Sequence, residues 1–323
     1  MHPIRSWRLV NSILLLGLFT LLGCSSKERP SNLDAKLSQD GTMVAVVRYR
    51  PSGAEMRVAR LDRRPIQWSR VDIPALTQTF NFGNRNDEIL ITYGKNHQDK
   101  PYTVHLAGVP LNETNRPLRE YASSDVFLAF PEQLADGSIL VLSGLYRTKT
   151  GSVPEKIWQI VTPGNWPRTI GEPFTGFGGE PGVIGTGFYA IEPVYKPAGA
   201  GPKLHLWALP GGGVPNVAHL LTQHTSGLAC TDHGDLCLRR QTFTNEFQFL
   251  GDLTAITNGK DCPLSELPRR IDRVHVAKNA RVAAVVVAKD AYAPRKLRIL
   301  EFARESCEVI NDIRTDISLW IEN

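Results

Sequence analysis

The chain alternates between short apolar runs and polar turns, and the same order recurs along most of its length. In each recurrence a short apolar segment meets a turn and then a strongly apolar run rich in Val, Ile and Leu. These paired segments occupy 33–47, 77–93, 126–145, 179–194, 226–241 and 272–288. Each is followed by a polar loop and a second alternating pair. Alternation bounded by Asp-Gly, Asn-Asp and Pro-Gly predicts β-strands and turns, and no stretch sustains a helical period.

The repeat predicts six units of four strands, named A to D in each unit, at a spacing of about 45 to 50 residues. The B segments are almost continuously apolar, which is typical of strands buried on both faces. Six four-stranded sheets in a ring make an all-β, six-bladed β-propeller over 33–323. The competing fold is a pair of β-sandwich domains. The C-terminal DISLWIEN (316–323) falls outside the six units, and it either closes the ring or begins a seventh blade.

One unit carries a motif of a known propeller family. LSQDGTMVAVV (37–47) resembles the Ser-x-Asp-Gly blade motif of TolB and related WD-repeat-like propellers, and ADGSILVLSG (135–144) matches it in part. The resemblance implies the propeller architecture and identifies no orthologue. TolB has a separate α/β domain before its propeller, whereas here the segment 24–32 leads directly into the first unit.

Residues 1–23 predict a secretory signal. Arg5 and Arg8 precede an apolar run at 13–22 that is too short to span a bilayer comfortably, and the run closes in Leu-Leu-Gly-Cys. This tetrapeptide resembles the bacterial lipobox, which implies that Cys24 is acylated and becomes the first mature residue. Several acyl chains anchor a protein durably, and Ser25 after the cysteine implies transfer to the outer membrane. The alternative is an ordinary signal peptide with an incidental cysteine.

The rest of the chain is then expected on the periplasmic side of a Gram-negative outer membrane, with 24–32 as a short tether. The formal net charge of +5 includes Arg5 and Arg8, so the mature protein is only mildly basic, at about +3. This charge and an exported location argue against a nucleic-acid partner.

Four cysteines follow Cys24, and an even number in an oxidising compartment predicts disulfides. Cys230 and Cys237 lie symmetrically about His233-Gly234, so a hairpin would place them directly opposite. Whether Cys262 and Cys307 pair is left open, because the repeat places both near the start of a strand D in adjacent blades, where outer strands diverge. No paired Cys or His spacing of a zinc site accompanies them.

The loops between strands B and C share an aromatic and basic character, beginning with RYRPSG (48–53). The residues concerned are Arg48, Tyr49, Arg50, Tyr93, Tyr146, Arg147, Tyr195, Lys196, Phe243 and Tyr292. All B–C loops of a propeller emerge on one face, so the sequence predicts a ring of aromatic and cationic side chains there. Tyr and Arg are enriched at binding hot spots. The alternative is that each Tyr packs between blades with its hydroxyl at the wet edge.

Catalytic motifs are sparse. The sequence contains no Gly-x-Ser-x-Gly and no Gly-x-x-x-x-Gly-Lys phosphate loop, and we expect no cofactor and no metal. His105, His205 and His275 lie inside alternating strand patterns and are expected to be structural.

Four carboxylates near the entries of innermost strands could converge at one mouth of the central channel: Asp34, Asp125, Glu180 and Asp272. Some propeller lactonases and glycosidases use carboxylates there for calcium binding or acid–base chemistry. The alternative is that they cap turns or pair with Arg269, Arg270 and Arg273.

The leading functional hypothesis is a non-catalytic, lipid-anchored periplasmic propeller that binds an envelope protein through its B–C loops. A second hypothesis is a hydrolase or lyase that acts on a glycan or lactone at the channel mouth. A third is binding of an anionic glycan or a lipid headgroup by the same ring of side chains.

Overall fold

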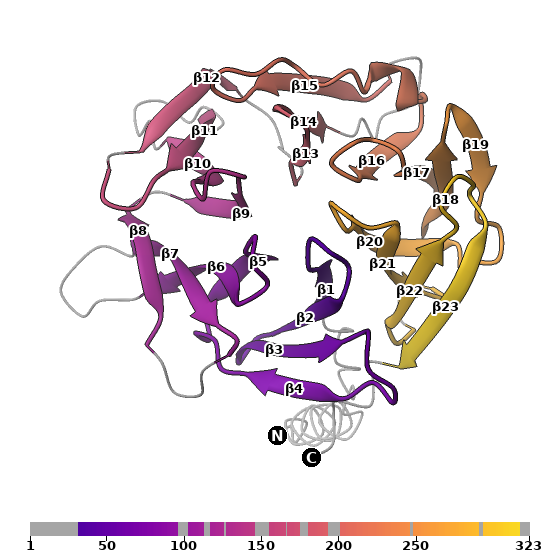
Figure 1. Ribbon diagram of the computed structural model, residues 1–323, viewed down its shortest axis with the longest axis horizontal. Coiled ribbons are helices and arrows are strands. Elements are labelled where there is room, and N and C mark those ends of the chain that lie inside the picture. Colours follow the sequence, from indigo (N-terminus) through magenta and orange to yellow (C-terminus); the bar gives the residue numbers. More distant parts are fainter. Residues whose placement is uncertain are drawn as a thin grey trace, which may run out of the picture. The chain divides into compact units, whose positions relative to one another are not determined.

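A computed structural model describes residues 32–95, 103–112, 117–125, 127–145, 155–165, 167–174, 180–192, 201–245, 248–290 and 293–316. The described strands form six antiparallel sheets that are arranged around a common centre, each built from strands that are consecutive in the sequence (Figure 1). The predicted all-β, six-bladed propeller is therefore confirmed. Within the described residues no helix is long and apolar enough to cross a membrane.

The first three sheets have four strands each. Blade 1 contains β1 (Asn32–Leu37), β2 (Met43–Arg50), β3 (Gly53–Arg60) and β4 (Trp68–Val71). Blade 2 contains β5 (Thr77–Phe82), β6 (Glu88–Lys95), β7 (Thr103–Pro110) and β8 (Arg119–Ser124). Blade 3 contains β9 (Leu128–Gln133), β10 (Ile139–Leu145), β11 (Glu155–Val161) and β12 (Arg168–Phe174).

The second half of the ring follows the same order. Blade 4 contains β13 (Gly182–Ile184), β14 (Gly187–Glu192) and β15 (Lys203–Ala208). Blade 5 contains β16 (Thr225–Cys230), β17 (Cys237–Asn245), β18 (Gln248–Thr257) and β19 (Lys260–Pro263). Blade 6 contains β20 (Arg270–Val276), β21 (Val282–Ala288), β22 (Lys296–Phe302) and β23 (Val309–Asp316). The remainder of DISLWIEN, 317–323, lies outside the described residues.

Blade 4 departs from the predicted four strands, because the described chain after β15 forms no strand before blade 5. The expected strand D is replaced by a loop and a short 3-10 helix, η1 (Ala218–Leu220). Pro210, Pro215 and three consecutive glycines between them explain the difference. Proline lacks the N–H that a strand pairing needs, and glycine weakens a strand.

The B strands are buried on both faces, as their continuous apolar runs predict. In β2, Val44 and Val46 pack against blade 6, whereas Ala45 and Val47 pack against blade 2, and all four are completely buried. Successive side chains of a strand point to opposite faces, so each B strand contributes to two inter-blade cores. The cores between stacked sheets therefore make up most of the hydrophobic interior.

The turns between strands A and B link neighbouring blades by hydrogen bonds on one face. Gln39 of blade 1 bonds Asn84 of blade 2, and the Asn84 N–H donates to Gln133 Oε1 of blade 3 at 2.7 Å. The Asp232 N–H donates to the Lys278 carbonyl at 2.8 Å, which joins blades 5 and 6. The junction of blades 3 and 4 is filled by aromatic rings, with Trp158 and Phe188 5.3 Å apart in an edge-on contact.

Two disulfides are present among the described residues. Cys230 and Cys237 are cross-strand partners in β16 and β17 with Cα atoms 4.1 Å apart, which confirms the predicted pair. Cys262 and Cys307, which the sequence left open, also form a disulfide, with Cα atoms 6.0 Å apart. Cys307 lies in the turn between β22 and β23, just before β23 begins at Val309. That turn reaches over blade 5, so the divergence of the outer strands does not separate the two cysteines.

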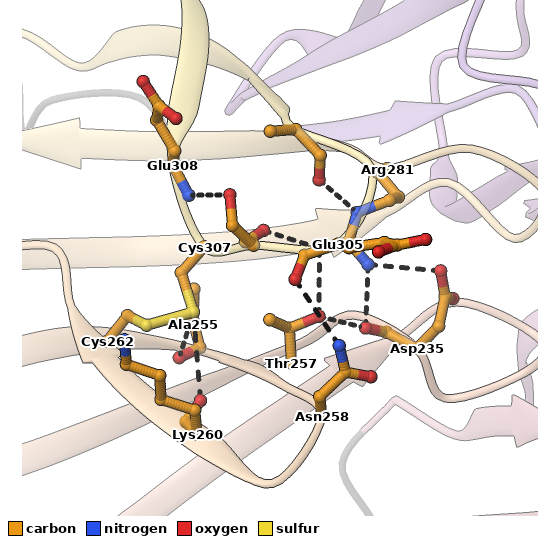
Figure 2. The surroundings of a disulfide bond; sticks show 12 residues. Asp235, Ala255, Thr257, Asn258, Lys260, Cys262, Arg281, Glu305, Cys307 and Glu308 are labelled. Carbon is orange, nitrogen blue, oxygen red and sulfur yellow. Dashed lines mark hydrogen bonds and ion pairs between the residues drawn. A yellow bond between two sulfur atoms is a disulfide. The ribbon is translucent and has the colours of Figure 1, made fainter.

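Arg281 reinforces this contact between blades 5 and 6 (Figure 2). Its guanidinium donates to the carbonyl oxygens of Ala303 and Ser306 in blade 6, both at 2.8 Å. It also donates to the carbonyl of Asp235 and to the hydroxyl of Thr257 in blade 5, at 2.8 and 3.0 Å. One side chain thus holds the reaching turn and the preceding blade together.

We expect the two disulfides to contribute unequally to stability. Cys262–Cys307 closes a separation of 45 residues and Cys230–Cys237 a separation of 7. Chain-entropy arguments give ~4 kcal/mol for the longer loop and ~2.5 kcal/mol for the shorter one. Guanidinium unfolding of the Cys262→Ser/Cys307→Ser and Cys230→Ser/Cys237→Ser variants measures the difference. A smaller loss for the first variant than for the second would contradict this expectation.

Candidate functional site

The innermost strands surround a cavity of about 440 Å³ along the central channel. All six blades contribute to its lining, through β1, β5, β9, β16 and β20 and through Glu180–Val183 at the start of blade 4. The end of the channel beside the B–C loops and D–A connections is called the B–C end, and the molecular surface there the B–C face. The opposite end, beside the A–B turns, is called the A–B end.

Tyr49 lies at the B–C end of this channel. Strand alternation places its side chain on the same face of β2 as Ala45 and Val47, packed toward blade 2. It lines the central cavity and also a second cavity of about 280 Å³ formed with Arg50–Ala54 and Ala75–Gln78. Burial, together with the negative charge of Asp34, raises the pKa of the Tyr49 hydroxyl. Tyr49 therefore separates the channel from the outer cavity.

The two arginines beside Tyr49 have different environments. Arg48 points to the other face of β2 and is buried, with an exposed fraction of 8%. Arg50 pairs with Glu55 on β3 at 3.3 Å and is partly exposed. In this triplet Arg48 is thus buried, the Tyr49 ring lies between the two cavities, and Arg50 is partly exposed.

Tyr93 packs on its own blade. Its ring stacks on His105 of β7, with centroids 5.1 Å apart and planes 19° apart. His105 in turn contacts Glu120 at 3.1 Å and Thr103 at 2.9 Å. Burial, and to a lesser degree the charge of Glu120, raises the pKa of Tyr93. The two described tyrosines of the predicted ring are therefore both engaged in packing contacts.

The rest of the predicted aromatic and cationic ring falls largely outside the described residues. This applies to Tyr146, Arg147, Tyr195, Lys196 and Tyr292, and also to the lipidation candidate Cys24. Phe243 has a described backbone, which pairs with Leu250, but its side chain lies outside the description. A continuous ring of these side chains stays a prediction.

Two of the four carboxylates predicted at the channel line the central cavity. They are Asp34, which lies 3.8 Å from Arg273, and Glu180, which forms an ion pair with Lys36. Asp272 pairs with Arg270 at 3.0 Å and with Arg295 at 2.7 Å.

The fourth predicted carboxylate, Asp125, is exposed on the connection between β8 and β9. Within the described residues no group of three His, Cys, Asp or Glu side chains is arranged to hold a metal ion.

In the described part of the chain, two ion pairs cross the channel between opposite blades. Lys36 of blade 1 reaches Glu180 of blade 4, and Lys278 of blade 6 reaches Glu132 of blade 3. Figure 1 places β1 opposite β13 and β20 opposite β9. Lys278 belongs to an A–B turn, so its pair with Glu132 lies at the A–B end. Glu132 also accepts a hydrogen bond from Asn81 of blade 2.

Sequence reasoning missed these cross-channel pairs. Lys36 is a charged residue inside the otherwise apolar segment LDAKL, and its side chain is only 3% exposed. Burial lowers the pKa of Lys36, an effect that the nearby charges of Asp34 and Glu132 oppose. A lysine at an interior strand position was the available signal, because a buried ammonium requires a partner.

His275 lies beside the same lysines and lines the cavity. Its Nδ1 accepts the backbone N–H of Leu37 at 3.1 Å, which joins blade 6 to blade 1. Burial, with the charges of Lys36 and Lys278, lowers the pKa of His275 well below its usual range. The imidazole is therefore neutral, and its proton sits on Nε2 because Nδ1 accepts. The structural role that the sequence predicts for His275 agrees with this contact.

Among the described residues, two large apolar side chains are exposed on the B–C face. Leu76 and Phe127 have exposed fractions of 45% and 38%, and they lie in the successive D–A connections that lead into β5 and β9. Leu76 also lines the outer cavity beside Tyr49. Sequence reasoning missed both residues, since a single apolar residue in a loop gives no periodic signal.

No protein-family model matches this chain, and no curated protein matches it. Solved propeller structures do. The chain is similar to an oligogalacturonate lyase from Vibrio parahaemolyticus, at 10% identity and a TM-score of 0.52, over 85% of this chain and 78% of that one. It is also similar to an acylaminoacyl peptidase from Pyrococcus horikoshii, at 8% identity and a TM-score of 0.51, over 87% of this chain and 46% of that one.

TolB from Acinetobacter baumannii is a further neighbour, at 13% identity and a TM-score of 0.45, over 72% of this chain and 54% of that one. The chain spans about half the length of several of the structures that it matches. The likeness to the lyase and to the acylaminoacyl peptidase shows the β-propeller fold.

The neutral His275 predicts a specific pH dependence of stability. Its folded-state pKa is depressed, so its contribution is fully present above the unfolded value of about 6.5 and is lost as the pH falls below that value. The expected slope is up to ~1.4 kcal/mol per pH unit. Urea unfolding of wild type and His275→Asn between pH 5 and 7.5 measures it. The exposed His233 provides the matched control, His233→Asn. An equal pH slope in all three proteins would contradict the assignment.

Proposed function

We propose that this chain is a non-catalytic binding propeller of the bacterial cell envelope that is anchored through Cys24 and engages a protein partner at its B–C face. The observation that carries the proposal is the exposed apolar pair Leu76 and Phe127 beside the B–C end of the channel. Large apolar side chains surrounded by polar ones are typical of the centres of protein interfaces.

The two apolar residues are held in place by the blades beneath them. The Gly94 N–H donates to the Leu76 carbonyl at 3.0 Å, and the Gly144 N–H donates to the Phe127 carbonyl at 2.9 Å. Both connections are thus fixed to the ends of B strands. A binding group that is rigid before binding loses less conformational entropy in the complex.

Charged groups near this pair suit a polar rim. Arg273 has a side chain that is 55% exposed at the B–C end of the channel, and Arg50, the last residue of β2, is partly exposed beside Glu55. Arginine combines with apolar anchors in interface hot spots. The B–C face therefore offers apolar contact and positive charge together.

The environment of the channel carboxylates favours binding over catalysis. Asp34, Glu132 and Glu180 each lie beside a cationic side chain. These ion pairs hold the three carboxylates in contacts between blades. This arrangement supports a binding role more than a hydrolase or lyase at the channel mouth.

The disulfides support an envelope location. Two disulfides within one chain fit an oxidising compartment such as the periplasm. The apolar N-terminal run and the Leu-Leu-Gly-Cys sequence supply the expected route of export and anchoring.

Site-specific photo-crosslinking in the cells that produce the protein tests the binding face. We expect a photoreactive residue at position 76 or 127 to give one discrete adduct with a partner protein. Controls at Val214 and Ile310, which are 61% and 62% exposed, sit in the loop after β15 and on the outer strand β23. Leu76→Asp should lower the adduct yield at position 127 by about tenfold. Adducts of equal yield at all four positions would refute the proposed face.

The anchor is tested separately with Cys24→Ser. Wild type should partition into the detergent phase of Triton X-114 and carry the mass of acyl chains on Cys24, because several chains anchor a protein durably. The variant should move to the aqueous phase and lack that mass. Unchanged partitioning of the variant would show that Cys24 is not the anchor.

A further inference from the structure

The two side chains of the Lys36–Glu180 ion pair differ in solvent exposure. The Lys36 side chain is 3% exposed, whereas the Glu180 side chain is 34% exposed and lines the central cavity. Glu180 precedes β13 and belongs to no described strand. A buried ammonium needs an anionic or polar partner, but nothing in the geometry of Lys36 requires that partner to come from this chain.

A second donor lies next to Lys36. The Nε2–H of His275 has no hydrogen-bond partner among the described residues, and His275 lines the same cavity. The Leu37 N–H donates to His275 Nδ1 at 3.1 Å, so the imidazole lies against β1 next to Lys36. Glu180, whose carboxylate contacts the Lys36 ammonium, and His275 both line this cavity, so a carboxylate in the place of Glu180 lies beside the ammonium and an imidazole N–H donor.

We propose that the central cavity binds a carboxylate group of an acidic partner segment on Lys36 Nζ and His275 Nε2–H, in the place that Glu180 now fills. Glu180 then occupies the ligand's position in the unbound protein, and the ligand carboxylate displaces it on binding. Arg273 and Tyr49, nearer the B–C end, border the path from the B–C face to Lys36.

The inference deepens the proposed function, on which it rests, by naming the chemistry of the partner. A polypeptide fits better than a sugar, because the apolar Leu76 and Phe127 flank the B–C end. Apolar anchors around a charged pocket suit an acidic side chain within an apolar sequence.

Calorimetric titration with a capped tri-glutamate peptide tests the site, with capped tri-glutamine as the neutral probe. Glu180→Gln removes the internal competitor and should tighten tri-glutamate binding by about tenfold. Glu305→Gln, in the exposed turn between β22 and β23, changes the net charge equally and should leave the affinity unchanged.

The double variant Lys36→Met/Glu180→Gln removes the buried ammonium together with its partner's charge, so that no unpaired charge remains to destabilise the fold. It should bind neither peptide. Equal affinities of Glu180→Gln and Glu305→Gln would overturn the proposal, as would undiminished binding by the double variant or no binding by any variant. Preference for trigalacturonate over tri-glutamate would also overturn it. Crosslinking at positions 76 and 127 does not depend on Lys36, so failure here is distinguishable from failure of the proposed function.

Discussion

Closure of the ring depends on the contact between blade 1 and blade 6. The described sheets each use consecutive strands, so these two blades share no described strand. They are joined by an aliphatic core that includes Val44 and Val46 from β2 and Val286 from β21. Two polar contacts accompany it, from the Leu37 N–H to His275 and from the Asn279 N–H to the Gln39 carbonyl at 2.8 Å. The contacts between opposite blades presuppose this one, because an open ring would move those blades apart.

The charged groups in the channel follow from closure. A pair between Lys36 and Glu180 joins blades that are far apart in sequence and opposite in the ring. Such pairs form only when the closed ring of six sheets sets the distance between opposite blades. They place charged groups at the centre of the ring. Ion pairs of this kind contribute little net stability relative to apolar packing. Their presence is therefore not explained by net stability alone.

Features encoded by local patterns could be predicted from the sequence. The alternation and the turn residues define five complete blades, and the apolar B segments predict burial on both faces, as in β2. Cys230 and Cys237 were predictable because a hairpin sets their register. The missing strand of blade 4 was also signalled, by two prolines and three glycines, but the regularity of the repeat outweighed that signal.

The remainder depends on distances between distant segments. Cys307 lies next to Cys262 because of the way blade 6 packs on blade 5. No local sequence pattern predicts that packing. The same holds for the cavity, whose lining residues come from all six blades. The carboxylates Asp34 and Glu180 were placed at the channel by repeat position alone, whereas their cationic partners required the closed ring.

The hydrogen-bonded A–B turns give the two faces of the ring different tolerances to change in length. The turn after β1 spans the five residues between Leu37 and Met43, and it bonds to its neighbours in both directions. An insertion there would disturb two junctions at once. The B–C connections range from the short turn between Arg50 and Gly53 to the long stretch between Glu192 and Lys203. During evolution, insertions are therefore accommodated in the B–C loops, whereas the A–B turns keep their length.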